Sequence, residues 1–195
     1  MRCTKNGGLT LKSRAYTLWQ IDTIAQSQTD RHCLATQIAG AAGLRAHELL
    51  TLRPQAQRAA STHRQWSSQR FLGRQGNLYT VTGKGGLIRE VLIPIELAMQ
   101  LEARRLARPI DVTDRSIHYH QYYDIGGGKL WSNSFSSASK RLFHWSHGAH
   151  GLRHGYAQQR MQELQQQGLL YAAALSIVSQ ELGHFRPDIT EVYLR

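Results

Sequence analysis

Three short segments of the sequence place basic side chains where they can hold an anion. The first, 43–52, reads GLRAHELLTL and puts Arg45 just after a predicted helix break. The second is the glycine-flanked Lys84, whose side chain at a tight turn can reach into a groove. The third reads HGLRH over 150–154, and its spacing puts His150 and Arg153 on one helix face. Near a helix N-terminus such donors can converge on one anion.

Two further segments lie near the end of the chain. A Leu-Gly-His triplet at 182–184 places His184 beyond a predicted helix end, and Tyr193 sits in the short element that follows. Each segment alone has an ordinary explanation, because an arginine at a helix start is usually solvated and a lone tyrosine usually packs. The ordered combination is therefore more informative than any single segment.

The segment 150–154 also permits a metal interpretation. His150 and His154 are four residues apart, which is the spacing of a helical zinc site, but Gly151 stands where that motif needs a glutamate. The two cysteines, Cys3 and Cys33, are too few for a cysteine-rich zinc site or a disulfide framework. We expect no metal, and a zinc hydrolase remains a weak alternative.

The charge pattern indicates a polyanionic partner. The formal net charge is +11, and no acidic residue occurs between Glu48 and Glu90 or between Asp124 and Glu163. Nucleic acid and an anionic membrane both fit such a charge, as does a plain basic surface. The basic tracts lack an amphipathic helix with a lysine face, which disfavours the membrane. We see no spanning segment and no secretory signal, and so expect a cytoplasmic, nucleoid-associated protein.

The elements that must position these residues are mostly helical. Apolar spacing predicts helices over about 12–27, 30–43 with Asp30 as N-cap, 46–52, 94–108, 133–145, 150–167 and 169–182, then a short element after Pro187. Two strands, 77–82 and 87–93, are predicted to form a hairpin around the glycine-rich turn 83–86. The fold class is therefore α+β, a mostly helical domain with one small antiparallel sheet. Residues 1–11 are expected to be a leader or linker, and 12–195 one domain.

The ordered segments resemble the tyrosine recombinase (phage integrase) family, over nearly the whole chain from about Ala15. That family has an arginine in a Gly-Leu-Arg box before a Glu-Leu-Leu-x-Leu run, then a hairpin lysine. A His-x-x-Arg box, a Leu-Gly-His box and a nucleophilic tyrosine follow. This sequence has all of them in that order.

The resemblance implies a role for each matching residue. Arg45 and Arg153 would clamp the scissile phosphate, Tyr193 would attack it, and Lys84 would protonate the leaving 5′-oxygen. His150 would assist proton transfer, His184 would hydrogen-bond the phosphate, and Glu48 would support the first arginine. No cofactor is implied. Further DNA contacts are expected from basic residues in the acid-free tracts and beside the boxes: Arg53, Arg74, Arg89, Lys140, Arg141 and His154.

The resemblance also implies partners and leaves alternatives. The expected partner is double-stranded DNA of the attachment-site type, bound by a homotetramer, and the expected context is a mobile genetic element. The N-terminal clamp domain usual in the family is expected to be absent, since little precedes Lys12, and only two residues follow Tyr193. The alternatives are a catalytically inactive DNA-binding remnant of an integrase and a type IB topoisomerase.

Overall fold

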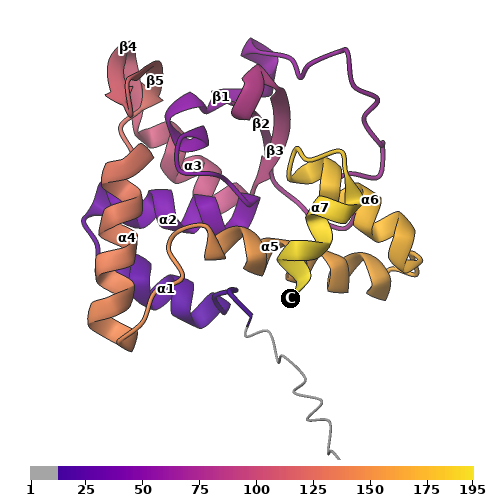
Figure 1. Ribbon diagram of the computed structural model, residues 1–195. Helices are drawn as coiled ribbons and strands as arrows, with labels where there is room; N and C mark the ends of the chain where they lie inside the picture. The colour runs from indigo at the N-terminus through magenta and orange to yellow at the C-terminus, as the bar shows by residue number, and fades with distance from the viewer. Residues whose placement is uncertain (1–12) are drawn as a thin grey trace, which may run out of the picture.

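The computed structural model describes residues 13–195, and the predicted leader 1–11 lies outside them. Seven α-helices and two small antiparallel sheets follow one another in these residues (Figure 1), which confirms the α+β class. The helices are α1 (Leu18–Gln26), α2 (Asp30–Ala42), α3 (Ile95–Ala103), α4 (Gly128–Phe143), α5 (Gly151–Gln166), α6 (Tyr171–Glu181) and α7 (Pro187–Glu191). None of them, within the described residues, combines the length and apolar character that a bilayer crossing needs.

The first two helices differ from prediction only at their starts. A capping box between Thr17 and Gln20 begins α1 at Leu18, so the helix starts later than predicted. The N-cap of α2 is Thr29, and Asp30 is instead the first helical residue. Gly43 ends α2 in the left-handed region at φ 61°, as its lack of a side chain permits. The predicted helix 46–52 is a 3₁₀ turn, Glu48–Thr51.

The hairpin was predicted correctly, but a second sheet was missed. Strand β2 (Asn77–Thr82) pairs with β3 (Ile88–Ile93), and the short β1 (Arg53–Pro54) adds to the other edge of β2. The helix predicted to reach 108 ends at Ala103, and the chain turns into β4 (Arg105–Asp114) and β5 (Ile117–Tyr123). This ribbon projects from the body of the molecule (Figure 1), and most of its residues are exposed.

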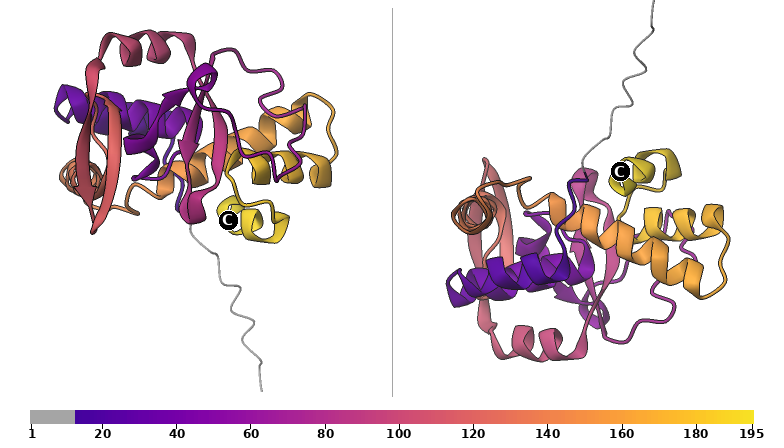
Figure 2. Two further views of the ribbon diagram at one scale, coloured as in Figure 1. Left: turned by 90° about the horizontal axis from the view of Figure 1, so that it is seen from above. Right: turned by 90° about the horizontal axis from the view of Figure 1, so that it is seen from below.

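Two groups of buried side chains hold the remaining helices in place. The larger joins α1 and α2 with the β2–β3 hairpin and the inner face of α4, which begins five residues earlier than predicted. The smaller joins α5 and α6, and it includes Tyr193 from a terminal 3₁₀ turn, Val192–Leu194. The terminal turn packs against α5, and α7 packs against α6. Both views of Figure 2 show this C-terminal segment at the α5–α6 end of the molecule. The chain thus returns Tyr193 to the helix that carries His150 and Arg153.

Candidate active site

Three arginines from distant parts of the chain meet at one buried carboxylate. Glu48 Oε1 accepts from Arg45 Nη1 at 2.9 Å, and Glu48 Oε2 accepts from Arg89 Nη2 at 2.8 Å. Arg153 Nη1 lies 3.8 Å from the same Oε2. Glu48 and Arg153 are fully buried, and the Arg45 side chain keeps 24% of its surface exposed. Arg45 and Arg153 are therefore neighbours, as the sequence predicted.

This cluster has more positive than negative charge. Burial alone would raise the pKa of Glu48, but the guanidinium groups of Arg89, Arg153 and Arg45 hold it well below its ordinary value. Among the described residues, Glu48 is the one carboxylate within salt-bridge distance of these three side chains. One carboxylate cannot balance three guanidinium groups, and a buried charge excess of this kind favours binding of an anion.

The end of α2 anchors two of these arginines. The carbonyl of Gly43, the residue that caps the helix, accepts from Arg89 Nη2 at 3.3 Å and also from Arg153 Nη1. Arg153 Nη2 donates to the carbonyl of Leu182 at 3.0 Å. Arg153 Nε is buried without a partner among the described residues. Such an unpaired buried donor is rare in folded proteins and is typical of functional sites.

The hairpin turn brings Lys84 to the same place. A Cβ on Gly83 would lie 3.3 Å from Glu48 Oε1 and 3.9 Å from Arg45 Nη1, so the turn passes close over the cluster. Lys84 follows directly and is exposed. Gly85 and Gly86 adopt positive φ, and a Cβ on either would meet nothing within 4 Å, so there is open space beside the tip of the turn.

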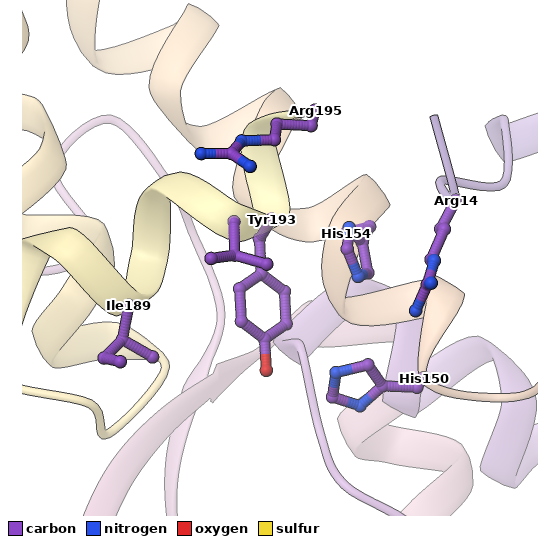
Figure 3. Close-up of a pocket in the computed structure, with 7 residues that line it drawn as sticks. Arg14, His150, His154, Ile189, Tyr193 and Arg195 are labelled. Carbon is purple, nitrogen blue, oxygen red and sulfur yellow. The ribbon is translucent and has the colours of Figure 1, made fainter. Parts of the chain in front are cut away.

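Tyr193 completes the site. Its ring centroid lies 5.2 Å from that of His150, 4.7 Å from His154 and 5.0 Å from His184. The guanidinium carbon of Arg153 is 5.7 Å from the Tyr193 ring centroid. In Figure 3 the phenolic oxygen points toward the His150 side of a cavity of about 390 Å³, which Arg14 and Arg195 also line. The nucleophile candidate thus lies directly beside the charged cluster.

Two of the histidines are neutral at neutral pH. Burial, then Arg153, lowers the pKa of His150 to about 4, and the same causes lower that of His184 to about 3. His184 Nε2 lies 3.0 Å from Arg153 Nη2, which can only donate, so Nε2 accepts. The His184 proton is therefore on Nδ1, which lies 3.1 Å from Thr190 Oγ1. A neutral His150 near the phenol is free to accept a proton.

The remaining predicted DNA contacts lie in several different environments. Lys140 and Arg141 are exposed on α4, on the far side of the molecule from α7 in Figure 1. Arg53 lies over the ring of Tyr122 at 4.1 Å, and Arg74 forms a salt bridge with Glu163 at 2.8 Å. Arg89 and His154 are buried, at 1% and 5% exposed. The structure therefore places these two side chains inside the site and not on the outer surface.

One sequence signal would have located Arg89. Residues 89, 91 and 93 alternate with less buried neighbours along β3, so Arg89 shares the inner face with Val91 and Ile93. Gln158, which no motif marked, also joins the site by donating to the Tyr193 carbonyl at 3.2 Å. It lies on the same face of α5 as His150 and His154. The described residues contain no group of three His, Cys, Asp or Glu side chains arranged to hold a metal ion.

Comparison with known proteins identifies the fold. No protein-family model and no curated protein matches the sequence. The XerH site-specific recombinase matches in its post-cleavage complex with palindromic difH at TM-score 0.57 and 16% identity, over 93% of this chain and 49% of XerH. The pre-cleavage complex of XerH with difH matches at TM-score 0.54 and 18% identity, over 96% of this chain and 52% of XerH. The Tn1549 transposon integrase, in complex with transposon right end DNA, matches at TM-score 0.52 and 13% identity, over 95% of this chain and 62% of the integrase chain.

These likenesses define the class of the fold. The chain has the fold of a tyrosine recombinase catalytic domain. It spans about half the length of the XerH chains and about three-fifths of the integrase chain.

Proposed function

We propose that this protein is a site-specific DNA recombinase that breaks and rejoins DNA strands through a 3′-phosphotyrosine intermediate. The observation that carries the proposal is the buried cluster in which Arg45, Arg89 and Arg153 share one carboxylate beside Tyr193. A phosphodiester supplies the missing negative charge. In the proposed reaction the phenolic oxygen of Tyr193 attacks that phosphate, and no metal or nucleotide is needed.

The arginines have two complementary tasks. Arg45 is partly exposed and meets the incoming phosphate, while the unpaired Nε of Arg153 binds an oxygen deeper in the site. Burial and the charge of Arg45 lower the pKa of Arg153 to about 10, which leaves it charged at neutral pH. Negative charge grows on the phosphoryl oxygens in the transition state, and each fixed donor there is worth about 10²–10³ in rate.

His150 and Lys84 transfer the two protons of the reaction. Tyr193 Oη bonds to phosphorus as the bond from phosphorus to the 5′-oxygen breaks, and its proton passes to the neutral imidazole of His150. Lys84, at the turn above the cluster, donates a proton to the leaving 5′-oxygen. The phosphodiester is exchanged for a phosphotyrosyl ester of similar energy, so the 5′-hydroxyl of a DNA strand can reverse the step.

The proposed partner is double-stranded DNA of the attachment-site type, bound by a homotetramer. The net charge of +11 and the exposed Lys140 and Arg141 favour association with phosphate backbones. The solved structures of XerH and the Tn1549 integrase hold DNA, which supports the same partner class for this chain.

The test is covalent trapping with a library of duplexes that carry randomised arms around one 5′-bridging phosphorothiolate. Attack at that position releases a 5′-thiol that rejoins poorly, so adducts accumulate and survive detergent. We expect adducts in EDTA, a single cleavage position on sequencing, and none with Tyr193→Phe. Tyr171→Phe, an exposed tyrosine on α6, is the matched control and should retain adduct formation.

Two other outcomes identify the alternatives. Salt-sensitive DNA binding without any adduct would identify a catalytically inactive remnant. Adducts without sequence preference, together with relaxation of supercoiled plasmid, would favour a type IB topoisomerase.

A further inference from the structure

One face of α5 holds the turn that carries Tyr193. His150, His154 and Gln158 follow one another at intervals of four residues, so their side chains line up on that face. The rings of His150 and His154 contact the Tyr193 ring, and Gln158 Nε2 donates to the Tyr193 carbonyl at 3.2 Å. The helix therefore contacts both the ring and the backbone of this residue.

His154 has a different place in this contact from His150. Of the His150, His154 and His184 rings, that of His154 is nearest to Tyr193, with centroids 4.7 Å apart and planes inclined by 32°. Figure 3 shows it beside the upper part of the tyrosine ring, whereas His150 lies nearer the phenolic oxygen. His154 is only 5% exposed, and its Nδ1 has no hydrogen-bond partner among the described residues. Its location fits contact with the tyrosine ring, not with DNA or with the leaving group.

The segment that bears Tyr193 depends on outside contacts for its position. Helix α7 has five residues and the terminal 3₁₀ turn three, too few for either to be stable alone. Gln158 Nε2 also donates to Ser13 Oγ at 3.0 Å, so the same amide fixes the segment that precedes α1. A Cβ on Gly155 would lie 2.9 Å from the carbonyl oxygen of Tyr16, and the bare helix surface there lets that segment pack closely.

We propose that His154 and Gln158 are positioning residues that hold Tyr193 in its own chain's active site, His154 through the ring and Gln158 through the backbone. This inference rests on the proposed function. Attack on phosphorus needs the phenolic oxygen within a narrow range of distance and angle, and a misplacement of about 1 Å can cost about 10²-fold in rate. Loss of either contact should therefore slow attack by Tyr193 and leave the phosphate-binding cluster intact.

The experiment distinguishes an effect on the position of Tyr193 from an effect on the arginine cluster that binds phosphate. The adduct rate on the phosphorothiolate duplex trapped by the wild-type protein is measured for His154→Ala and Gln158→Ala. The controls are His63→Ala and Gln162→Ala, which remove the same side-chain types at exposed positions. In a Tyr193→Phe background, hydrogen peroxide then replaces the phenol as attacking nucleophile, and the rate of peroxide cleavage is measured with and without each change.

We expect His154→Ala to lower the adduct rate by about 10–100-fold. Gln158→Ala should lower it less, because it removes hydrogen bonds to the carbonyls of Tyr193 and Arg195 but no contact with the tyrosine ring. DNA affinity and peroxide cleavage should stay within about twofold of their parent proteins. His154→Phe keeps a ring against Tyr193 and should recover most of the lost rate, which separates positioning from a failure to fold.

Three results would overturn the inference. An unchanged or faster adduct rate in His154→Ala would show that the contact does not place the tyrosine for attack. An equal loss of peroxide cleavage would assign His154 to the phosphate cluster or to folding. Failure of the wild-type protein to form any adduct would remove the proposed function, and this inference with it, whereas the first two results leave that function standing.

Discussion

Replacing Glu48 with glutamine tests the central cluster most directly. The change keeps the shape of the side chain and removes the only negative charge within salt-bridge distance of Arg45, Arg89 and Arg153 in the described residues. The amide can still accept from one or two of the guanidinium groups, but its NH₂ end must then face another donor. Two buried guanidinium groups and the partly exposed Arg45 would lose their common counter-charge.

The expected loss of stability is large. At an effective dielectric constant of about 20, unit charges about 4 Å apart attract by about 4 kcal/mol, and three arginines contribute. The desolvation of Glu48 opposes much of this sum, and removing one partner of a buried ion pair typically costs about 3–5 kcal/mol. For a chain of this size each kcal/mol lowers Tm by about 2–4 °C, so we expect a fall of about 10 °C.

Urea denaturation and thermal melting at pH 7 measure this loss. Inorganic phosphate should restore part of it, because an anion that binds only the folded cluster stabilises it by mass action. Glu96→Gln, at an exposed glutamate on α3, is the control. A loss below about 1 kcal/mol would refute the reasoning, because it is the size typical of an exposed ion pair.

Three further predictions concern the elements around the cluster. Lys84→Ala should slow adduct formation about 10²-fold on an ordinary nicked phosphodiester but far less on the phosphorothiolate, since a thiolate leaves without a proton. An equal loss on both substrates would remove Lys84 from the general-acid role. His184 has a pKa of about 3 in the fold against 6.5 unfolded, so its neutral form stabilises the fold above about pH 6.5, and this contribution is lost on acidification. His184→Gln should therefore show a smaller Tm decrease between pH 7 and 4.5, and an unchanged decrease would contradict it. Gly183→Ala should cost about 1–2 kcal/mol in urea denaturation, because Gly183 has φ +72° and the new Cβ would lie 2.9 Å from Arg89 Cδ.

Sequence patterns predicted the helices and strands whose residue spacing, turns and caps match the burial that the structure shows. Strand β3 alternates in burial and follows a glycine turn, and α2 has a clear start and a left-handed glycine end. The ribbon β4–β5 was missed because most of its residues are exposed and the helix predicted to reach 108 overlapped the start of β4. Helix α4 begins at Gly128, a poor helix former, because Trp131 and Phe135 pack into the core and override propensity.

The sequence indicated candidate residues for the site but not how they pack against one another. The ordered segments singled out Arg45, Lys84, His150, Arg153, His184 and Tyr193. The structure links all of these except Lys84 by direct contacts, and it brings the turn that carries Lys84 beside Glu48 and Arg45. Spacing alone did not indicate that Glu48 serves three arginines, nor that His154 packs on the tyrosine, because both facts depend on contacts between distant segments. A basic residue in an acid-free tract looks like a DNA contact even when, like Arg89, it lies in the interior.

The shared carbonyl of Gly43 has a consequence for the working conditions of the protein. The C-terminal end of α2 carries a partial negative charge, and Arg89 and Arg153 are bonded to it directly. Unlike a carboxylate, this backbone group cannot be protonated, and unlike a solution ion it cannot be displaced by salt. The two guanidinium groups should thus keep their orientation in salt strong enough to strip bound DNA, so that protein recovered from such salt is ready to bind again without rebuilding its site.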